Sequence, residues 1–247
     1  LSNPRPTLET YKYQMPGEPG PKEYLYIFDL KENTNKTVKL VAFKDQQSEF
    51  FTKPYTRDNM YKKYHSSVWL GDDKGFYMVR QSRDQKRLDV CRVDLDSDST
   101  KTVITERMNT YVEIRNIRLI KNGSQIIQWS ERNGWANLYL YNADGTLVKN
   151  LTEGAFHVED VLGINEKENY LIFSACGVNK GENPYQMHTY RVSLDGGPIK
   201  QLDMDDMDDD LVFANDEIYN NIMDYAHKIE NKNYRGCHLT TSILFML

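Results

Sequence analysis

Residues 114–154 read IRNIRLIKNGSQIIQWSERNGWANLYLYNADGTLVKNLTEG, and this stretch decides the fold. Four mostly apolar runs alternate in it with three short polar segments. In the run NLYLY, Leu138 and Leu140 alternate with Tyr139 and Tyr141, as in a β-strand whose two faces are both specified. The next residues, NADG, end in Gly145, and glycine supplies the positive φ that tight hairpin turns require. The stretch therefore predicts four antiparallel strands joined by short turns.

The same order of runs and turns recurs twice, in residues 66–106 and 158–202. Equivalent positions in the second run are 50 and 45 residues apart, at Tyr77, Ile127 and Ile172. The third run closes at positions 48 and 51 residues apart, at Asp94, Asn142 and Ser193. A four-strand period of about 45 to 50 residues is typical of a β-propeller blade.

A half-unit precedes these three units. YLYIFDL (residues 24–30) resembles a third strand, ENTNK its turn and TVKLVAF a fourth strand, followed by a longer connection over residues 44–63. The fold class is therefore all-β, with about three and a half four-stranded blades over residues 1–203. Propellers typically have 4 to 8 blades, so we expect a partial propeller.

The repeat stops after Leu202. DMDDMDDD (residues 203–210) begins an atypical acidic tail, assigned here to residues 204–247. Ile218, Ile222, Tyr225 and Ile229 have helical spacing, which predicts a short amphipathic helix. Truncation of a longer protein and a scrambled reading frame are the two interpretations of this ending.

Composition excludes several classes. Hydrophobic residues make up 39% and charged residues 27%, as in a globular protein, and the net charge of −5 argues against a nucleic-acid partner. The three cysteines, Cys91, Cys176 and Cys237, form neither a disulfide framework nor a CxxC metal pair. There is no apolar run long enough to span a membrane.

No catalytic residue is predicted. The chain has no G-x-S-x-G string, and the nearest sequence, Gly123-Ser124, falls in a turn between two predicted strands. Structural or surface roles are the favoured interpretation of the five isolated histidines, which are His65, His157, His188, His227 and His238.

No metal or cofactor is predicted either. DLDSDST (residues 94–100) and the acidic run both offer D-x-D spacing, but neither has the Gly and Glu of a calcium loop. A solvated hairpin and a solvated tail are the favoured interpretations.

SERNGW (residues 130–135) is the most distinctive loop. Glu131 and Arg132 precede a turn at Asn133-Gly134, and Trp135 opens the next strand. We favour packing of Trp135 between blades over contact with a ligand, because conspicuous aromatic residues are more often core.

Residues 129–164 resemble the signature stretch of the N-terminal domain of the dipeptidyl peptidase IV family, in which SERDGW-x-HLYLY is followed by an LT-x-G-x-W-x-V segment. This chain has Asn133, Asn137 and Phe156 where that pattern has Asp, His and Trp. Residues 5–30 and the segment NTYVEIR are also similar to the family, especially to its Bacteroidetes-type members.

The resemblance implies an eight-bladed propeller that caps an α/β-hydrolase domain. Such enzymes remove N-terminal dipeptides with Pro or Ala second, and the propeller limits access to the active site. The implied partners are peptide substrates and the hydrolase domain, whose catalytic triad this chain lacks. Homodimerisation and export to the periplasm or cell envelope are implied in the same way.

By position, the family's cavity-facing segment corresponds to Tyr111, Glu113 and Arg115, which are therefore the predicted substrate contacts. An ion pair between blades is an equally good interpretation of the two charged residues. Two rival functions remain open at this point: a stand-alone propeller that binds a protein partner, and a propeller associated with translocation scaffolds.

Overall fold

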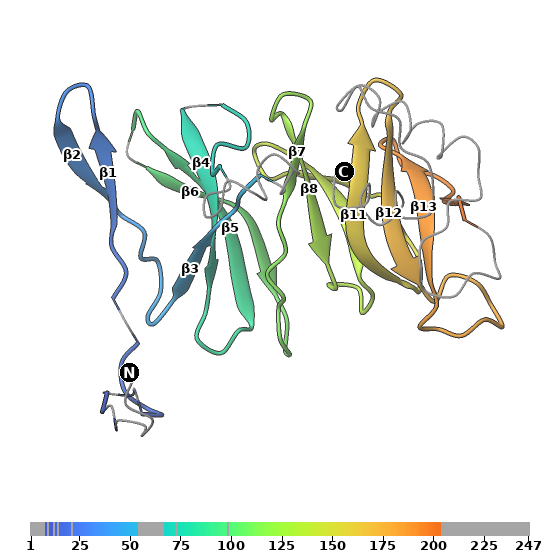
Figure 1. Cartoon of the computed structure of the whole chain (residues 1–247), viewed down its shortest axis with the longest axis horizontal. Helices are drawn as coiled ribbons and strands as arrows, with labels where there is room; N and C mark the ends of the chain where they lie inside the picture. The colour runs from blue at the N-terminus through green and yellow to red at the C-terminus, as the bar shows by residue number, and fades with distance from the viewer. Residues whose placement is uncertain are drawn as a thin grey trace, which may run out of the picture.

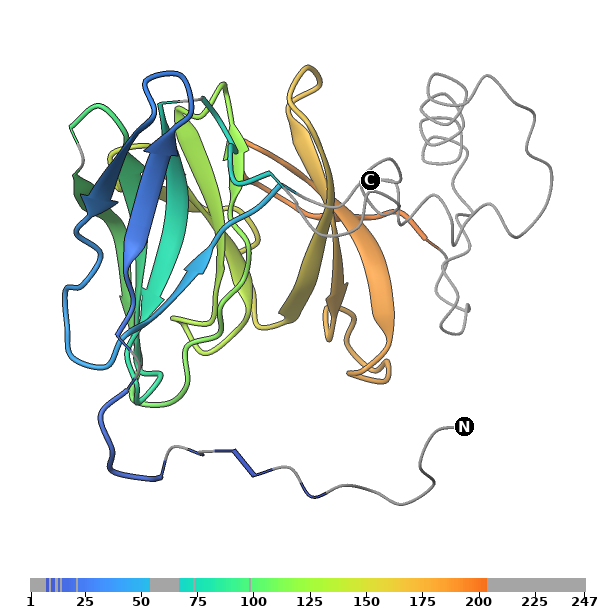
Figure 2. The same ribbon diagram turned by 60° about the vertical axis from the view of Figure 1, so that its left-hand side comes forward.

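The computed structural model describes residues 8, 10, 11, 13, 15–20, 22–53, 67–72, 74–97 and 99–203. These residues contain fourteen β-strands and no helix. A hairpin of β1 (Leu25–Asp29) and β2 (Thr34–Val38) is followed by three four-stranded antiparallel sheets. The sheets stand side by side in chain order and, over the described residues, do not close into a ring (Figure 1 and Figure 2). The prediction of a partial, all-β propeller is confirmed.

Each sheet is a meander in which consecutive strands pair, so we call it a blade. The first blade consists of β3 (Gln47–Phe50), β4 (Gly75–Gln81), β5 (Arg87–Asp94) and β6 (Thr100–Arg107). The second consists of β7 (Arg118–Ile120), β8 (Gln125–Ser130), β9 (Asn137–Asn142) and β10 (Leu147–Asn150). The third consists of β11 (His157–Asn165), β12 (Tyr170–Cys176), β13 (Met187–Ser193) and β14 (Lys200–Gln201).

The repeat positions agree with the strands. Tyr77, Ile127 and Ile172 all lie in the second strand of their blades, and Asp94, Asn142 and Ser193 are the last residues of the third strands. Gly145 has a φ of 94° in the turn between β9 and β10, and a Cβ there would lie 1.9 Å from the carbonyl oxygen of Val103. Glycine is therefore required at this turn both for its conformation and for its small size.

Two boundaries differ from the prediction. The first strand of the first blade is β3, not the apolar run at residues 66–70, because residues 47–50 complete the ladder beside β4. The first hairpin turns earlier than expected. Asp29 accepts hydrogen bonds from the backbone amides of Lys31 and Glu32 at 2.8 and 3.1 Å, and Asn33 has a φ of 51°. This local geometry places the turn before residue 34, so β2 begins within the expected turn.

Each apolar core lies between two sheets. The side chains of β4 alternate: Phe76 and Met78 face the β1–β2 hairpin, and Tyr77 and Val79 face the second blade. The side chains of β9 alternate likewise, with Tyr139 and Tyr141 facing the first blade and Leu138 and Leu140 facing the third. The strict period of two therefore makes one sheet contribute to two cores.

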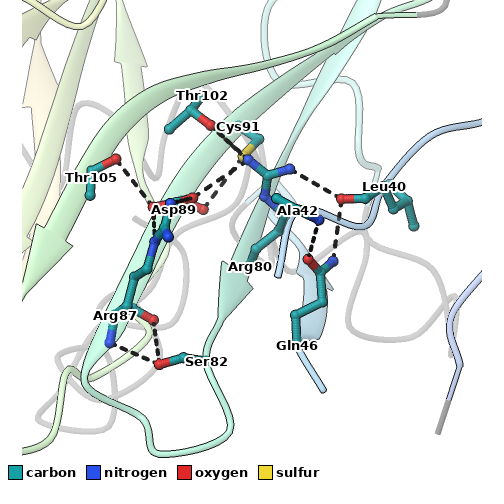
Figure 3. Close-up of polar contacts among 10 residues, drawn as sticks. All are labelled: Leu40, Ala42, Gln46, Arg80, Ser82, Arg87, Asp89, Cys91, Thr102 and Thr105. Atoms are coloured by element: carbon teal, nitrogen blue, oxygen red, sulfur yellow. Dashed lines mark hydrogen bonds and ion pairs between the residues drawn. The ribbon is translucent and has the colours of Figure 1, made fainter. Parts of the chain in front are cut away.

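A buried polar cluster joins the first blade to the connection after β2 (Figure 3). Asp89, fully buried, accepts hydrogen bonds from Nε and Nη2 of Arg87 at 3.0 and 2.8 Å and from Thr105 Oγ1 at 3.1 Å. Arg80, 3.5 Å from the same carboxylate, donates to the carbonyl oxygen of Leu40 at 3.1 Å. The cluster holds residue 40 against β4, since a buried charge is tolerated only with such partners.

Within the described residues no helix is long and apolar enough to span a membrane. The predicted acidic tail and its helix at residues 204–247 lie outside the described residues, so the boundary after residue 203 stays a prediction.

Replacing a large residue of the core between the second and third blades by alanine should markedly lower the free energy of unfolding. Phe173 is fully buried and stacks on Tyr190 with ring centroids 5.7 Å apart, so Phe173→Ala should lower the free energy of unfolding by about 3–5 kcal/mol. The matched control is Tyr185→Ala, because Tyr185 is 86% exposed and should change stability by less than about 0.5 kcal/mol. Urea unfolding followed by circular dichroism measures both, and equal midpoints would contradict the assigned core.

Candidate functional site

A cleft of about 170 Å³ opens between the second and third blades. Its polar lining contains two arginines, Arg115 and Arg118, and two carboxylates, Glu159 and Asp160. Its apolar lining includes Trp129 and Leu138. We call it the charged cleft. It combines groups that can bind a carboxylate or carbonyl oxygen with groups that can bind an ammonium, over an apolar wall.

Arg115 is the most connected residue of the charged cleft. Its Nε lies 2.6 Å from Oε1 of Glu113, and its Nη2 lies 3.6 Å from Oε1 of Glu159 on β11. Its Nη1 donates to the carbonyl oxygen of Glu159 at 3.3 Å, and the guanidinium sits 4.9 Å from the ring centroid of Trp129. The structure thus brings two of the predicted contacts, Glu113 and Arg115, into an ion pair, and Arg115 separately links this segment to the third blade through Glu159. Whether they also contact substrate stays a prediction.

Arg118, Glu159 and Asp160 were not singled out from the sequence. Arg118 Nη2 lies 3.8 Å from Oδ1 of Asp160, across the interface between β7 and β11. Burial lowers the pKa of the Arg118 guanidinium, and the neighbouring Asp160 carboxylate opposes that shift. Only the packing of adjacent blades brings Arg118 to the two carboxylates, since it is more than 40 positions from both in the sequence.

Tyr111, the third predicted contact, lies outside the lining of the charged cleft and is 49% exposed. Its neighbour Val112 donates its amide to the carbonyl oxygen of Gln85 at 2.8 Å, which ties this segment to the turn between β4 and β5. Tyr111 is therefore available at the surface near the first blade.

The signature loop places Arg132 inward and Trp135 outward. The Arg132 guanidinium lies 4.4 Å from the ring centroid of Tyr139 and 5.5 Å from that of Tyr141. Glu131 accepts the amide hydrogen bond of Gly134 at 2.8 Å through its carbonyl oxygen, so it helps to form the turn.

Packing of Trp135 between blades, the interpretation favoured from the sequence, is wrong. Trp135 is 47% exposed, whereas Trp129 is 7% exposed and donates its indole N–H to the carbonyl oxygen of Val158 at 2.6 Å. Trp129 packs between the second and third blades. The alternation along β8 directs Trp129 to that core, while Trp135 follows a glycine turn at the strand end.

Glu106 on β6 anchors Arg132. The buried carboxylate accepts hydrogen bonds from Ser130 Oγ and, at 3.1 Å, from Gln128 Nε2, and lies 3.6 Å from Nη2 of Arg132. Burial raises the pKa of Glu106, and the Ser130 hydrogen bond and the Arg132 charge oppose the rise. The conspicuous Ser130 and Arg132 thus hold the second blade to the first.

His188 forms a second polar cluster in the third blade. Its Nε2 lies 2.8 Å from Glu182 Oε1, and its Nδ1 lies 3.3 Å from Asp203 Oδ1. The imidazole is 2% exposed, so it is out of reach of a substrate. This geometry agrees with a structural role for this histidine.

Two sequences considered above as possible catalytic or metal-binding motifs, Gly123-Ser124 and residues 94–100, lie in turns. Ser124 donates to the carbonyl oxygen of Lys121 at 2.8 Å between β7 and β8. Asp94 accepts from the amide and the hydroxyl of Ser97 at 2.8 and 2.7 Å in the turn after β5. Among the described residues, no group of three His, Cys, Asp or Glu side chains is arranged to hold a metal ion.

Comparison with known proteins gives a consistent result. The family model described as the N-terminal region of dipeptidyl peptidase IV matches residues 2–226. Dipeptidyl peptidase 4 of Trichophyton rubrum is 30% identical over 136 residues, which cover 52% of this chain and 17% of that protein. The Trichophyton equinum protein is 29% identical over 143 residues, covering 55% and 18%. The matched part of the chain therefore spans less than a fifth of these relatives.

Two solved structures share the fold. The crystal structure of Porphyromonas gingivalis dipeptidyl peptidase 4 superposes with a TM-score of 0.57 at 17% identity, covering 74% of this chain and 23% of that one. A protein assigned as a dipeptidyl aminopeptidase IV from Bacteroides ovatus gives 0.59 at 20% identity, covering 76% and 27%.

Stability should depend on pH through Glu106. Because its pKa is raised above the ordinary 4.5, the folded protein keeps the proton to higher pH than the unfolded chain. The free energy of unfolding therefore contains a contribution that falls as pH rises from about 4.5 through the folded-state pKa. Glu106→Gln removes this contribution, so the variant should gain stability relative to the parent as pH rises.

Urea unfolding between about pH 4.5 and about pH 8 measures this difference. Glu168→Gln is the matched control for replacing a carboxylate by an amide, because Glu168 is exposed in the turn after β11. A constant offset for Glu106→Gln would show that the carboxylate does not titrate differently in the folded state.

Proposed function

The chain belongs to the dipeptidyl peptidase IV N-terminal family, and from this premise we propose that it is the non-catalytic propeller portion of a prolyl dipeptidyl peptidase. In this role it would gate and contact peptide substrates for an α/β-hydrolase domain that removes N-terminal dipeptides with Pro or Ala second. The family match over residues 2–226 is the observation that carries the proposal. Export to the cell envelope and dimerisation of the full-length protein are parts of the same proposal.

The charged cleft is the surface we propose for the peptide. A peptide N-terminus carries an ammonium, hydrogen-bond donors and carbonyl oxygens within a few ångströms of each other. Glu159 and Asp160 can bind the ammonium, and the Arg115 guanidinium can donate to a carbonyl oxygen by a charge-assisted hydrogen bond. Trp129 and Leu138 supply an apolar wall for a proline ring.

Arg115 would have to exchange partners when a peptide enters. In the structure it is held by Glu113 and Glu159, which keep it at the cleft edge. Its 31% side-chain exposure leaves room for a ligand to approach. Exposed ion pairs contribute only about 0–1 kcal/mol, so exchange for a peptide oxygen costs little.

The chain on its own should release no chromophore from a Gly-Pro p-nitroanilide substrate. The reason is that the sequence has no nucleophile elbow. Continuous absorbance measurement with purified protein, with a known prolyl dipeptidyl peptidase as positive control, tests this. Turnover that co-purifies with the chain would contradict the proposal that the chemistry belongs to another domain.

Binding at the charged cleft should depend on Arg115. The chain has three tryptophans, so 5-fluorotryptophan labelling gives three fluorine resonances that Trp→Phe variants assign. Titration with the neutral-side-chain tripeptide Gly-Pro-Ala should shift the Trp129 resonance, because Arg115 lies over that ring. Arg115→Gln should weaken this response about five-fold, as expected for one charged contact.

The matched control is Arg191→Gln. Arg191 lies 4.5 Å from the Tyr170 ring centroid, a similar stacking outside the charged cleft. It should change stability to a similar extent and leave the titration unaltered. An equal response in parent and Arg115→Gln would remove the charged cleft from the proposal.

A further inference from the structure

A second and larger cleft, of about 540 Å³, lies at the end of the first blade. We call it the basic cleft. It is formed by the connection after β2, the turn between β4 and β5, and the end of β6. Five of its lining side chains are cationic, namely Lys44, Arg83, Lys86, Arg87 and Arg107. The lining contains one carboxylate, that of Asp84, in a chain whose net charge is −5.

Two of the cations are rigidly held. Arg87 is paired with Asp89 through two hydrogen bonds, and its guanidinium lies 4.6 Å from the ring centroid of Phe43. Arg83 Nη1 lies 3.1 Å from Oδ2 of Asp45 and 2.6 Å from the carbonyl oxygen of Glu18. These pairs fix the walls of the basic cleft.

The other three cations, Lys44, Lys86 and Arg107, are exposed and make no side-chain hydrogen bond or ion pair with the described residues. Lys86 and Lys44 each have an attractive electrostatic interaction with one carboxylate, that of Asp84 and that of Asp45 respectively. Asp84 accepts hydrogen bonds from Ser82 Oγ and the amide of Lys86, at 2.5 and 3.2 Å, and these bonds lower its pKa. The Asp84 carboxylate therefore stabilises the turn between β4 and β5.

The strand register places two of the cations directly opposite each other. Arg87 and Arg107 are direct partners across the β5–β6 ladder, and like charges directly opposite destabilise a sheet. The adjoining turn contains Gln85 at a φ of 58°, a left-handed conformation that is costly for a residue other than glycine. A like-charge pair directly across a ladder is a departure from local rules of the kind expected at functional sites.

We propose that the basic cleft binds acidic side chains of a peptide, and that it sets a preference for acidic residues beyond the N-terminal dipeptide. The inference rests on the proposed function in taking a peptide as the ligand. The exposed cations of the lining match carboxylates, and Phe43 and Met108 offer apolar contact to the stem of an Asp- or Glu-containing segment. The amide of Val112 bonds to the same turn, so the basic cleft lies beside exposed Tyr111.

The charge of the whole chain favours a short acidic peptide over a long polyanion. A nucleic acid or a sulfated polysaccharide would extend beyond the basic cleft over a surface of net negative charge. A peptide with two or three carboxylates matches the three exposed cations of the basic cleft, Lys44, Lys86 and Arg107.

The test is fluorescence anisotropy with an N-acetylated, fluorescein-labelled hexapeptide that alternates Leu with Asp and Glu. Acetylation removes the N-terminal ammonium, so the probe does not depend on the charged cleft. The parent chain should bind this peptide at least about ten-fold more tightly than the matching Asn/Gln peptide, and added salt should weaken the binding. Equal affinity for the two peptides would overturn the inference.

Arg107→Gln and Lys86→Gln should each weaken binding about five-fold. Arg107→Gln should also keep or raise the melting temperature, because it removes the like-charge pair with Arg87. Lys167→Gln is the matched control, since Lys167 is exposed in the turn after β11, away from the basic cleft. Unchanged binding in both variants, or a polyanion such as heparin that binds and is not displaced by the acidic peptide, would overturn the proposed ligand.

The two proposals fail separately. Loss of acidic-peptide preference with an intact Arg115-dependent fluorine response would overturn the basic cleft alone. Loss of that response with an intact acidic preference would overturn the charged cleft and leave the basic cleft standing.

Discussion

The alternation of side chains in β4, β8 and β9 makes each of these strands contribute to two cores at once, and the rest of the structure depends on this constraint. Ile126 faces the first blade while its neighbour Ile127 faces the third. No blade can therefore bury its apolar faces without neighbours on both sides. Where the described structure supplies a neighbour on one side only, the other face stays open: Leu25 and Ile27 of the hairpin pack inward, while Tyr26 and Phe28 are 52% and 65% exposed.

Polar contacts between blades fix the register in which the apolar faces pack against each other. Trp129 bonds to the backbone of β11, and Glu106 receives Ser130 and Gln128 from β8. Each joins a strand to the next blade at a defined register, which an apolar interface alone specifies poorly. The same contacts shape the charged cleft, because Arg115 stacks on the Trp129 that β11 holds in place. Folding and site formation thus depend on the same interface.

The sequence was sufficient to predict the features that repeat along the chain and those that depend only on neighbouring residues. The period placed the ends of β5, β9 and β13 at Asp94, Asn142 and Ser193, and the NADG turn followed from the φ that glycine allows. Prediction from the sequence failed where two segments far apart in the chain could take the same place in the fold. Residues 66–70 have the apolar run of a strand, but residues 47–50 complete the ladder beside β4, and one sequence does not tell which segment pairs. Trp135 was assigned to a core because tryptophan is usually buried, whereas the alternation of β8 directs Trp129 there.

The two clefts show why sites between blades are hard to read from a chain. Arg115 and Glu159 are 44 positions apart, and in the sequence each has the appearance of an ordinary solvated charge. Lys44, Lys86 and Arg107 likewise come from two separate connections and the last residue of β6, which meet only at the end of the first blade. Loops at strand ends are freer to vary than the strands, whose faces are committed to two cores. In a propeller the scaffold therefore restricts new side-chain chemistry to connections and strand ends, and Arg107, opposite Arg87 at the end of β6, lies at such a place.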